Sequence, residues 1–197
     1  MKNRPYHHGD LPSELLARAE RTLREKGSGA LSLRELARDI GVSPAAPSRH
    51  FKNKQALLDA LALNGFERFD EAVAASQEGV GESFGERLDA MARAYVDFAV
   101  ANAALLDLMF SVKHSLEASE ALGAAAHRWS EQFLGLIAEG QRRGEVRKGP
   151  VERVALPVFA ALHGYADLTV SGMLPPEMTA YGLDDVVASV LRQCGPE

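Results

Sequence analysis

Residues 31–62 read LSLRELARDIGVSPAAPSRHFKNKQALLDALA, and the spacing within this stretch decides the fold. Apolar side chains recur in its first part with the period of one helix face: Leu33, Leu36, Ala37 and Ile40. Gly41 ends that pattern, and Ser43-Pro44 is typical of the N-cap and first residue of another helix. Because only Gly41 and Val42 separate the two helices, the chain must turn sharply between them. This arrangement predicts a helix-turn-helix unit, in which the second helix enters the major groove of DNA.

The residues before this unit predict a further helix that packs against it. Residues 11–26 have an amphipathic pattern, with Asp10 as a candidate N-cap and Gly27 as a stop. Ser32 and Glu35 have the spacing of a capping box, in which each side chain satisfies a backbone donor of the other residue. We therefore expect three helices around a small apolar core at this end of the chain.

The outer side of the predicted reading helix carries small side chains and one arginine: Ser43, Ala45, Ala46, Ser48 and Arg49. Small side chains allow a close approach to base edges and thymine methyl groups, and Arg49 can reach a phosphate or a guanine edge. Asn53 is a candidate N-cap for a long helix that runs to about Ser76. The first amides of that helix, with Lys52 and Lys54, suit a DNA phosphate.

The charge of the chain is divided unevenly. The whole chain has a net charge of -5, but residues 1–55 carry 11 Lys and Arg against 6 Asp and Glu. The rest carries 11 basic and 21 acidic residues, so a basic segment of net +5 precedes an acidic body of net −10. Short helices with a glycine turn also occur in bundles that never meet DNA. The uneven charge together with the capped turn favours a polyanion partner.

Several classes of protein are excluded or disfavoured. Hydrophobic residues make up 46% of 197 residues, which is typical of a globular chain that buries a core. One cysteine, Cys194, forms no internal disulfide and no zinc site alone, and no apolar run is long enough to cross a bilayer. The sequence contains no phosphate-loop, dinucleotide, metalloprotease or serine-hydrolase motif. We therefore expect a cytoplasmic non-enzyme without cofactor, metal or membrane partner.

Two stretches carry a family resemblance. YHHGDL, from Tyr6, and the quoted residues to Ala62 resemble the DNA-binding domain of TetR-type transcriptional repressors. Near Leu162–Met173, the text ALHGYADLTVSGM resembles the tryptophan-histidine-glycine signature of one C-terminal subclass, with Leu162 where tryptophan is usual. The resemblance implies an all-helical homodimer that binds a palindromic operator and releases it when a small ligand occupies the C-terminal domain.

The resemblance also assigns DNA contacts. Arg34 matches a region that contacts phosphate, Lys54 matches a phosphate-holding lysine, and Arg49 is the expected base reader of the recognition helix. That helix matches Ser43, Ala45, Ala46, Ser48, Arg49 and His50. Lys2, Asn3 and Arg4 form either a minor-groove arm or a disordered end.

One departure affects the recognition helix. Pro47-Ser48 stands where the family usually has an aliphatic-aromatic pair. Pro47 has no N–H for the Ser43 carbonyl, which weakens the first turn and leaves the start of the helix open.

The acidic body is predicted to be helical over residues 84–101, 103–110, 116–142, 154–173 and 183–191. Candidate walls of an effector pocket are Tyr95, Phe98, Met109, Phe110, Trp129, Phe133 and His163; ordinary core packing is the alternative for each. Residues 154–173 hold one carboxylate and no Lys or Arg, so this helix must be covered on more than one side. Either it is the central helix of a monomer, or it forms a dimer interface with residues 183–191 through Leu162, Tyr165, Leu168, Val186 and Val190.

These observations predict an all-α protein of about nine helices in two domains, residues 1–55 for DNA and residues 56–197 for ligand and dimer contacts. The expected function is a homodimeric transcriptional regulator, a repressor, that responds to an unknown small-molecule effector. The alternatives are a helical small-molecule-binding protein without specific DNA binding and a helical lyase or hydrolase. Substitution of Arg49 or Lys54 by alanine discriminates the first alternative, because only a DNA reader loses specific binding or salt dependence.

Overall fold

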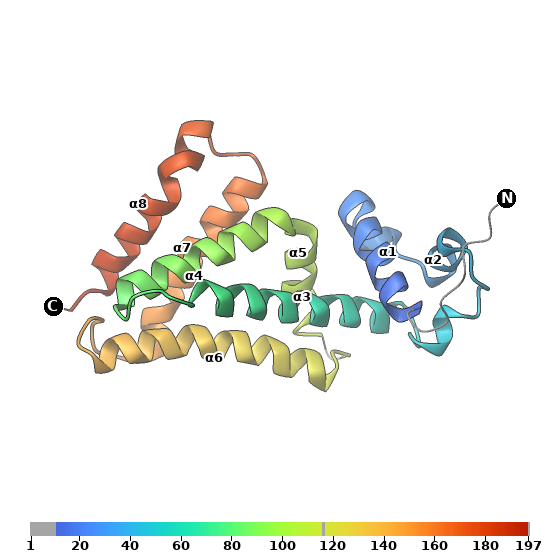
Figure 1. Cartoon of the computed structure of the whole chain (residues 1–197), viewed down its shortest axis with the longest axis horizontal. Helices are drawn as coiled ribbons and strands as arrows, with labels where there is room; N and C mark the ends of the chain where they lie inside the picture. Colours follow the sequence, from blue (N-terminus) through green and yellow to red (C-terminus); the bar gives the residue numbers. More distant parts are fainter. Residues whose placement is uncertain (1–10, 116, 197) are drawn as a thin grey trace. The chain divides into compact units, whose positions relative to one another are not determined.

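The computed structural model describes residues 11–115 and 117–196, and this part of the chain is helical without a strand (Figure 1). Its elements are α1 (Leu11–Lys26), η1 (Ser28–Ala30), α2 (Leu33–Ile40), η2 (Pro47–Arg49), α3 (Lys54–Ser76), α4 (Phe84–Ala101), α5 (Ala103–Val112), α6 (Glu120–Arg142), α7 (Val151–Val170) and α8 (Pro176–Cys194). The all-α prediction is confirmed. Predictions made for Asp10 and for the arm at Lys2, Asn3 and Arg4 lie outside the described residues.

Packing divides the chain into two compact units. The first consists of the chain up to Gly65 together with Ala104–Gly123, and the second consists of Phe66–Ala103 together with the chain from Ala124 onward. The helices α3 and α6 each begin in the first unit and end in the second. The predicted division at residue 55 rests on sequence and stays a prediction.

The first unit is built around the faces that the sequence pattern marks as apolar. Its core holds Leu15, Ala19, Leu23, Leu31, Leu36, Ala37, Phe51, Leu57 and Leu61. The helices α1 and α2 pack together, and η1 and η2 contact α1. In the same unit α3 lies close to α5, because a Cβ atom at Gly65 would lie 2.6 Å from the Met109 sulfur. Only glycine fits there without a shift of the methionine side chain.

The sharp turn after α2 is confirmed, and its geometry requires glycine. Gly41 is left-handed, with φ 77° and ψ 28°. Its N–H donates to the Arg38 carbonyl at 3.2 Å, and the Val42 N–H donates to the Ala37 carbonyl at 2.9 Å. These two bonds form a Schellman motif, which satisfies carbonyls at the helix end and reverses the chain.

The predicted capping box at Ser32 and Glu35 is absent, because the Ser32 side chain makes no hydrogen bond to α2. A capping box forms instead before α4, where the Glu86 N–H donates to Ser83 Oγ and the Ser83 N–H donates to Glu86 Oε2, both at 3.3 Å. Backbone conformation differs between the two sites, with φ −143° at Ser32 and −67° at Ser83. The Ser32 hydroxyl is therefore directed differently from that of Ser83.

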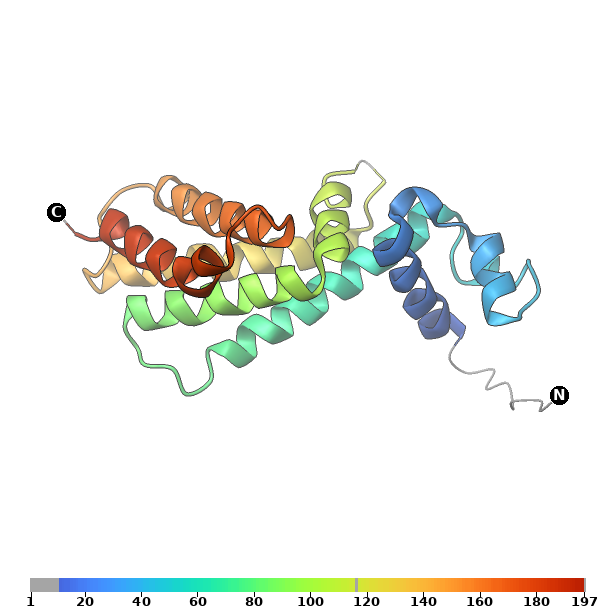
Figure 2. The ribbon, with the colours of Figure 1, turned by 90° about the horizontal axis from the view of Figure 1, so that it is seen from above.

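The second unit packs α4, α7 and α8 against one another, with α7 and α8 side by side (Figure 2). Its α4 has the predicted bounds, whereas α6 begins four residues later than the expected start at residue 116. Within the described residues, no single helix is long and apolar enough to cross a membrane; α4 and α5 pass that test only when they are taken together across a bent break.

Candidate nucleic-acid interface

The predicted reading helix forms as a sequence of tighter turns. The Ala46 N–H donates to the Ser43 carbonyl at 2.9 Å, the Arg49 N–H to the Ala46 carbonyl at 3.2 Å, and the His50 N–H to the Pro47 carbonyl at 3.0 Å. Each of these bonds spans three residues, and Pro47–Arg49 forms the 3-10 segment η2. The expectation of an α-helix that starts at Pro44 is therefore corrected. Pro47 has no N–H with which to make the four-residue bond to Ser43.

Pro47 is nevertheless buried in the first unit, and Ser48 beside it is exposed. Pro47 therefore places an apolar side chain in the core of the first unit. The pair Pro47-Ser48 changes the helix type of residues 43–50, which we call the reading segment. The segment still packs against the core through Pro47.

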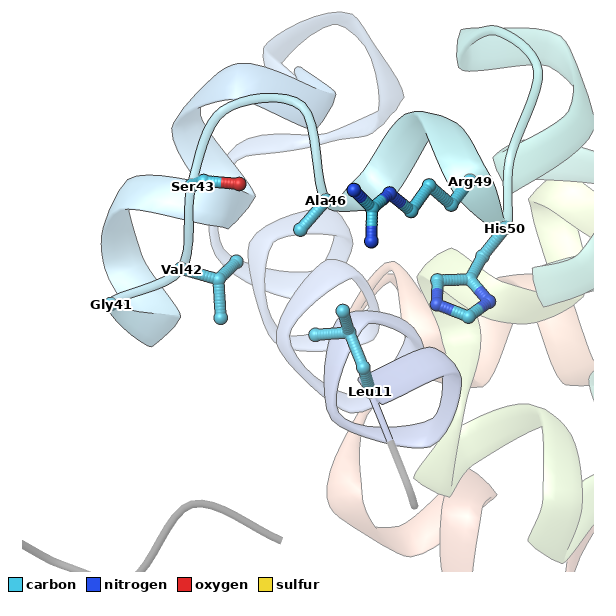
Figure 3. A pocket seen from close by; sticks show the side chains of 7 residues that line it. All are labelled: Leu11, Gly41, Val42, Ser43, Ala46, Arg49 and His50. Atoms are coloured by element: carbon cyan, nitrogen blue, oxygen red, sulfur yellow. The ribbon is translucent and has the colours of Figure 1, made fainter. Parts of the chain in front are cut away.

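A groove runs along the reading segment (Figure 3). It has a volume of about 520 Å³ and is lined by Leu11, Gly41, Val42, Ser43, Ala46, Arg49 and His50. Figure 3 shows the Arg49 guanidinium directed toward Ala46 and the His50 ring beside it. The groove thus gathers two basic side chains and a hydroxyl at the segment that the sequence predicts to face DNA.

The other predicted DNA contacts of the first unit have the exposure that such contacts need. Arg34, Ala45, Ser48 and Lys52 are exposed, as are Ser43, Arg49 and His50, while Ala46 is half-buried. Asn53 caps α3 as predicted, because its Oδ1 accepts the Ala56 N–H at 2.8 Å. Lys54 is half-buried, and its ammonium donates to the Gly29 carbonyl at 3.0 Å. An ammonium has three donors, so this bond leaves Lys54 able to meet a phosphate.

An ion pair that sequence reasoning missed joins α1 to α2. Arg18 Nε and Nη2 lie 2.9 and 2.6 Å from the same carboxylate oxygen of Asp39. The Arg18 guanidinium holds the pKa of Asp39 below its usual value, chiefly through this hydrogen bonding. The two residues are 21 positions apart, so no local spacing in the sequence indicates their contact.

The second unit contains an aromatic cluster that includes most of the predicted effector-pocket walls. Phe69, Tyr95, Phe98, Trp129, Phe133, Phe159 and His163 contact one another with ring centroids 4.6 to 6.3 Å apart. Phe69 and Phe159 were not predicted to belong to it. Met109 and Phe110 lie in the first unit, and Met109 packs against Gly65 there.

One polar contact enters this cluster. The Tyr95 hydroxyl lies 2.6 Å from His163 Nδ1, and burial raises the pKa of Tyr95 above its usual value. Tyr95 is fully buried, whereas His163 is exposed on α7. Ordinary core packing, the alternative considered for His163, does not describe it: the ring has a partner, but it lies at the surface of the unit.

The predicted interface residues on α7 and α8 divide into two groups. Leu162, Tyr165 and Val190 are at most 7% exposed, because their own protomer encloses them. They have little surface left for a partner, and their place in an interface stays a prediction. Leu168 and Val186 remain at least partly exposed. Other apolar side chains on or beside these helices are more exposed: Leu156 at 67%, Met173 at 71%, Met178 at 57% and Tyr181 at 71%.

Among residues 11–115 and 117–196, no group of three His, Cys, Asp or Glu side chains is placed to hold a metal ion. Two acidic side chains of the second unit form ion pairs with one arginine. Arg93 contacts Asp89 and Asp184 at 2.9 and 2.6 Å and so ties α4 to α8.

Comparisons with known proteins match both parts of the chain. Residues 15–61 match the family model of bacterial regulatory proteins of the tetR family, and residues 88–193 match the model described as the tetracyclin repressor-like C-terminal domain. The HTH-type transcriptional regulator Rv1816 of Mycobacterium tuberculosis is 26% identical over 140 residues, which are 70% of this chain. The match spans 60% of the length of that relative.

Solved structures agree over nearly the whole chain. A protein of unknown function from Rhodococcus sp. RHA1 is 42% identical, with a TM-score of 0.85 over 98% of this chain and 100% of that one. A bacterial regulatory protein in the tetR family from Rhodococcus RHA1 is 25% identical, with a TM-score of 0.72 over 93% of this chain and 96% of that one.

Proposed function

Because the chain belongs to the TetR family of bacterial regulatory proteins, we propose that this DNA-binding transcription regulator binds a palindromic operator as a homodimer. In the proposed cycle it represses transcription until a small molecule binds in the second unit and lowers its affinity for the operator. Proteins of this family are generally not enzymes, and the matched models describe regulators.

The observation that carries the proposal is the reading segment after the Gly41 turn. Gly41 reverses the chain so that residues 43–50 follow directly on α2, and Ser48, Arg49 and His50 are exposed there. Exposed basic side chains at a helix-turn-helix attract the phosphates of the DNA backbone, whatever the base sequence of the duplex. Small side chains such as Ala45 supply close approach to base edges.

The homodimer is supported by the exposed apolar side chains of α7 and α8. Leu156, Ala160, Gly164 and Leu168 recur every four residues on α7, so successive members are neighbours in one row along the helix. Leu156 in this row and Tyr181 on α8 are among the most exposed apolar side chains. A second copy of the chain that covers these side chains places two reading segments on one duplex, and half-sites are then about 34–36 Å apart.

The response to an effector is supported by the continuity of two helices. Since α3 and α6 each belong to both units, a ligand that favours one packing of the aromatic cluster also favours one orientation of the helices leading to the first unit. The ligand can shift operator affinity only by the difference between its affinities for the two conformations.

The test is selection of bound sites from random duplex DNA by the full-length protein. A recovered palindrome supports the proposal, and no preference for any duplex over bulk competitor contradicts it. Lys52→Ala is a suitable variant because Lys52 is exposed. The substitution removes one phosphate contact from each protomer, so it should lower the slope of log affinity against log salt by about 1.8 for the dimer, twice the value of about 0.9 for one contact. Lys148→Ala removes an exposed charge from the second unit and should leave the slope unchanged.

A further inference from the structure

The groove along the reading segment has a three-residue period. Ser43, Ala46 and Arg49 all line it, and consecutive backbone bonds join Ala46 to Ser43 and Arg49 to Ala46. In a chain with such three-residue bonds, side chains three positions apart lie above one another. Pro47 lacks the N–H that an α-helical turn would bond to the Ser43 carbonyl, and that carbonyl accepts the Ala46 N–H. The same edge of the segment therefore holds the Ser43 hydroxyl and the Arg49 guanidinium.

The basic side chains of this groove have no acidic partner within the described part of the chain. Neither Arg49 nor His50 has a side-chain hydrogen bond or an ion pair there. Figure 3 shows the Arg49 guanidinium over the groove next to Ala46, with the His50 ring beside it and Leu11 opposite. The remaining walls, Leu11 and Val42, are apolar and offer no donor to a base edge.

A guanidinium, a hydroxyl and an imidazole around one concave space match the oxygens of a phosphate. Guanidinium groups bind phosphate through two parallel hydrogen bonds, and such charge-assisted bonds are the stronger class. A base reader, in contrast, must extend outward from the protein to reach into the major groove. In this chain Pro44, Ala45 and Ser48 are exposed and do not line the groove.

We propose that the groove seats one phosphate of the DNA backbone, with Arg49, His50 and Ser43 around it. Arg49 then fixes the register of the protein on the duplex, and the bases are read by Pro44, Ala45 and Ser48 through small, mostly apolar contacts. This inference rests on the proposed function, and it replaces the expectation that Arg49 is the base reader. Apolar contacts of this kind favour thymine methyl groups.

The experiment uses the selected operator and a set of duplexes in which each backbone phosphate in turn is replaced by a neutral methylphosphonate. One replacement is expected to weaken the wild-type protein about tenfold and to weaken Arg49→Ala clearly less, because the variant has already lost the Arg49 contact to that phosphate and keeps only those of His50 and Ser43. Arg49→Ala should also weaken operator and scrambled duplex by the same factor and lower the salt slope of the dimer by about 1.8, which is about 0.9 for each of the two protomers. Arg49→Lys should recover the slope, since an ammonium keeps the charge. Lys148→Ala, with its charge in the second unit, is the matched control.

Two results would overturn the inference. In one, Arg49→Ala loses discrimination at a single base pair while its binding to scrambled duplex is unchanged, which identifies a base reader. In the other, every methylphosphonate affects wild type and Arg49→Ala equally. Both results leave specific operator binding by the wild type intact, so they differ from failure of the proposed function, in which the wild type prefers no duplex at all. Circular dichroism and thermal unfolding of Arg49→Ala establish that the exposed substitution leaves the fold intact.

Discussion

Arg18 on α1 holds Asp39 on α2 through two nitrogens that donate to one carboxylate oxygen, at 2.9 and 2.6 Å. This contact joins the supporting helix of the first unit to the helix that precedes the reading segment. Loss of the contact should therefore reduce both stability and DNA affinity, although neither residue is predicted to touch DNA.

Arg18→Ala is expected to destabilise the protein at neutral pH, and the difference from wild type should shrink in acid. Asp39 has a lowered pKa in the folded state, so its ionised form contributes stability above the unfolded value of about 3.9. That contribution is lost as the pH falls through the lower, folded pKa. Urea unfolding between neutral pH and pH 3 measures the difference. A constant gap between wild type and variant over this range would contradict the assignment, and Asp39→Asn controls for the titrating group.

Gly41→Ala should destabilise the first unit by about 1–2 kcal/mol, because an L side chain is strained in the left-handed conformation that Gly41 adopts. Gly29→Ala is the matched control: its backbone is not left-handed and it likewise has no atom within 4 Å of an added Cβ. Thermal unfolding compares the two. Equal stability of both variants would mean that the turn accepts any residue.

Asp59→Ala should cost about 1–2 kcal/mol. The carboxylate is only 8% exposed, and its Oδ1 accepts the Ser119 N–H at 3.1 Å, just before α6 begins. Asp59→Asn keeps an acceptor oxygen and should lose less. Denaturant unfolding measures the free energy of unfolding of the two variants. An equal loss in both would show that the hydrogen bond from the Ser119 N–H to residue 59 is not the cause.

Tyr181→Arg should convert the proposed dimer to monomer, with dimerisation weakened by about tenfold or more, because the substitution places a charge on an apolar face. Val100→Arg changes another exposed apolar residue, 51% exposed on α4, and should leave the dimer intact. Sedimentation velocity measures both. A dimer that survives Tyr181→Arg and dissociates with Val100→Arg would place the interface on α4.

Pro47→Leu restores an N–H that can bond to the Ser43 carbonyl, and it should turn residues 43–49 into an α-helical turn. The expected gain is about 1 kcal/mol, less than the cost of a proline in a helix interior. The operator preference should change, because the edge formed by Ser43, Ala46 and Arg49 loses its three-residue period. Repeated site selection with the variant tests this; an unchanged operator would show that the shape of the segment does not set specificity.

Local signals in the sequence were sufficient for most helices. Asn53 caps α3 as its residue type predicts, and Phe84–Ala101 forms the helix that its apolar spacing predicts. The type of helix in the reading segment was harder to predict. Pro47 lies within its first turn, where the loss of one backbone hydrogen bond separates an α-helix from a 3-10 helix. Spacing alone did not decide between these outcomes.

The predicted interface shows a different limit. A helix such as α7 that is apolar nearly all round must be covered, but its own sequence does not say which face the protomer covers. Tyr165 is enclosed and Leu156 is exposed, although both are large apolar positions on the same helix. The outcome depends on α4 and α8, which pack against α7. Likewise, only the fold brings Arg18 to Asp39.

The route of the chain through the first unit sets a rule for protein engineering. Asp59 accepts a hydrogen bond from Ser119, and Gly65 packs against Met109. A DNA-binding fragment that ends at residue 55 or 65 therefore lacks Ala104–Gly123, which belongs to the same unit. A chimaera that transplants this DNA-binding unit onto another sensor must graft two separate segments, the N-terminal one and Ala104–Gly123, with one junction inside α3 after Gly65 and another inside α6 after Gly123.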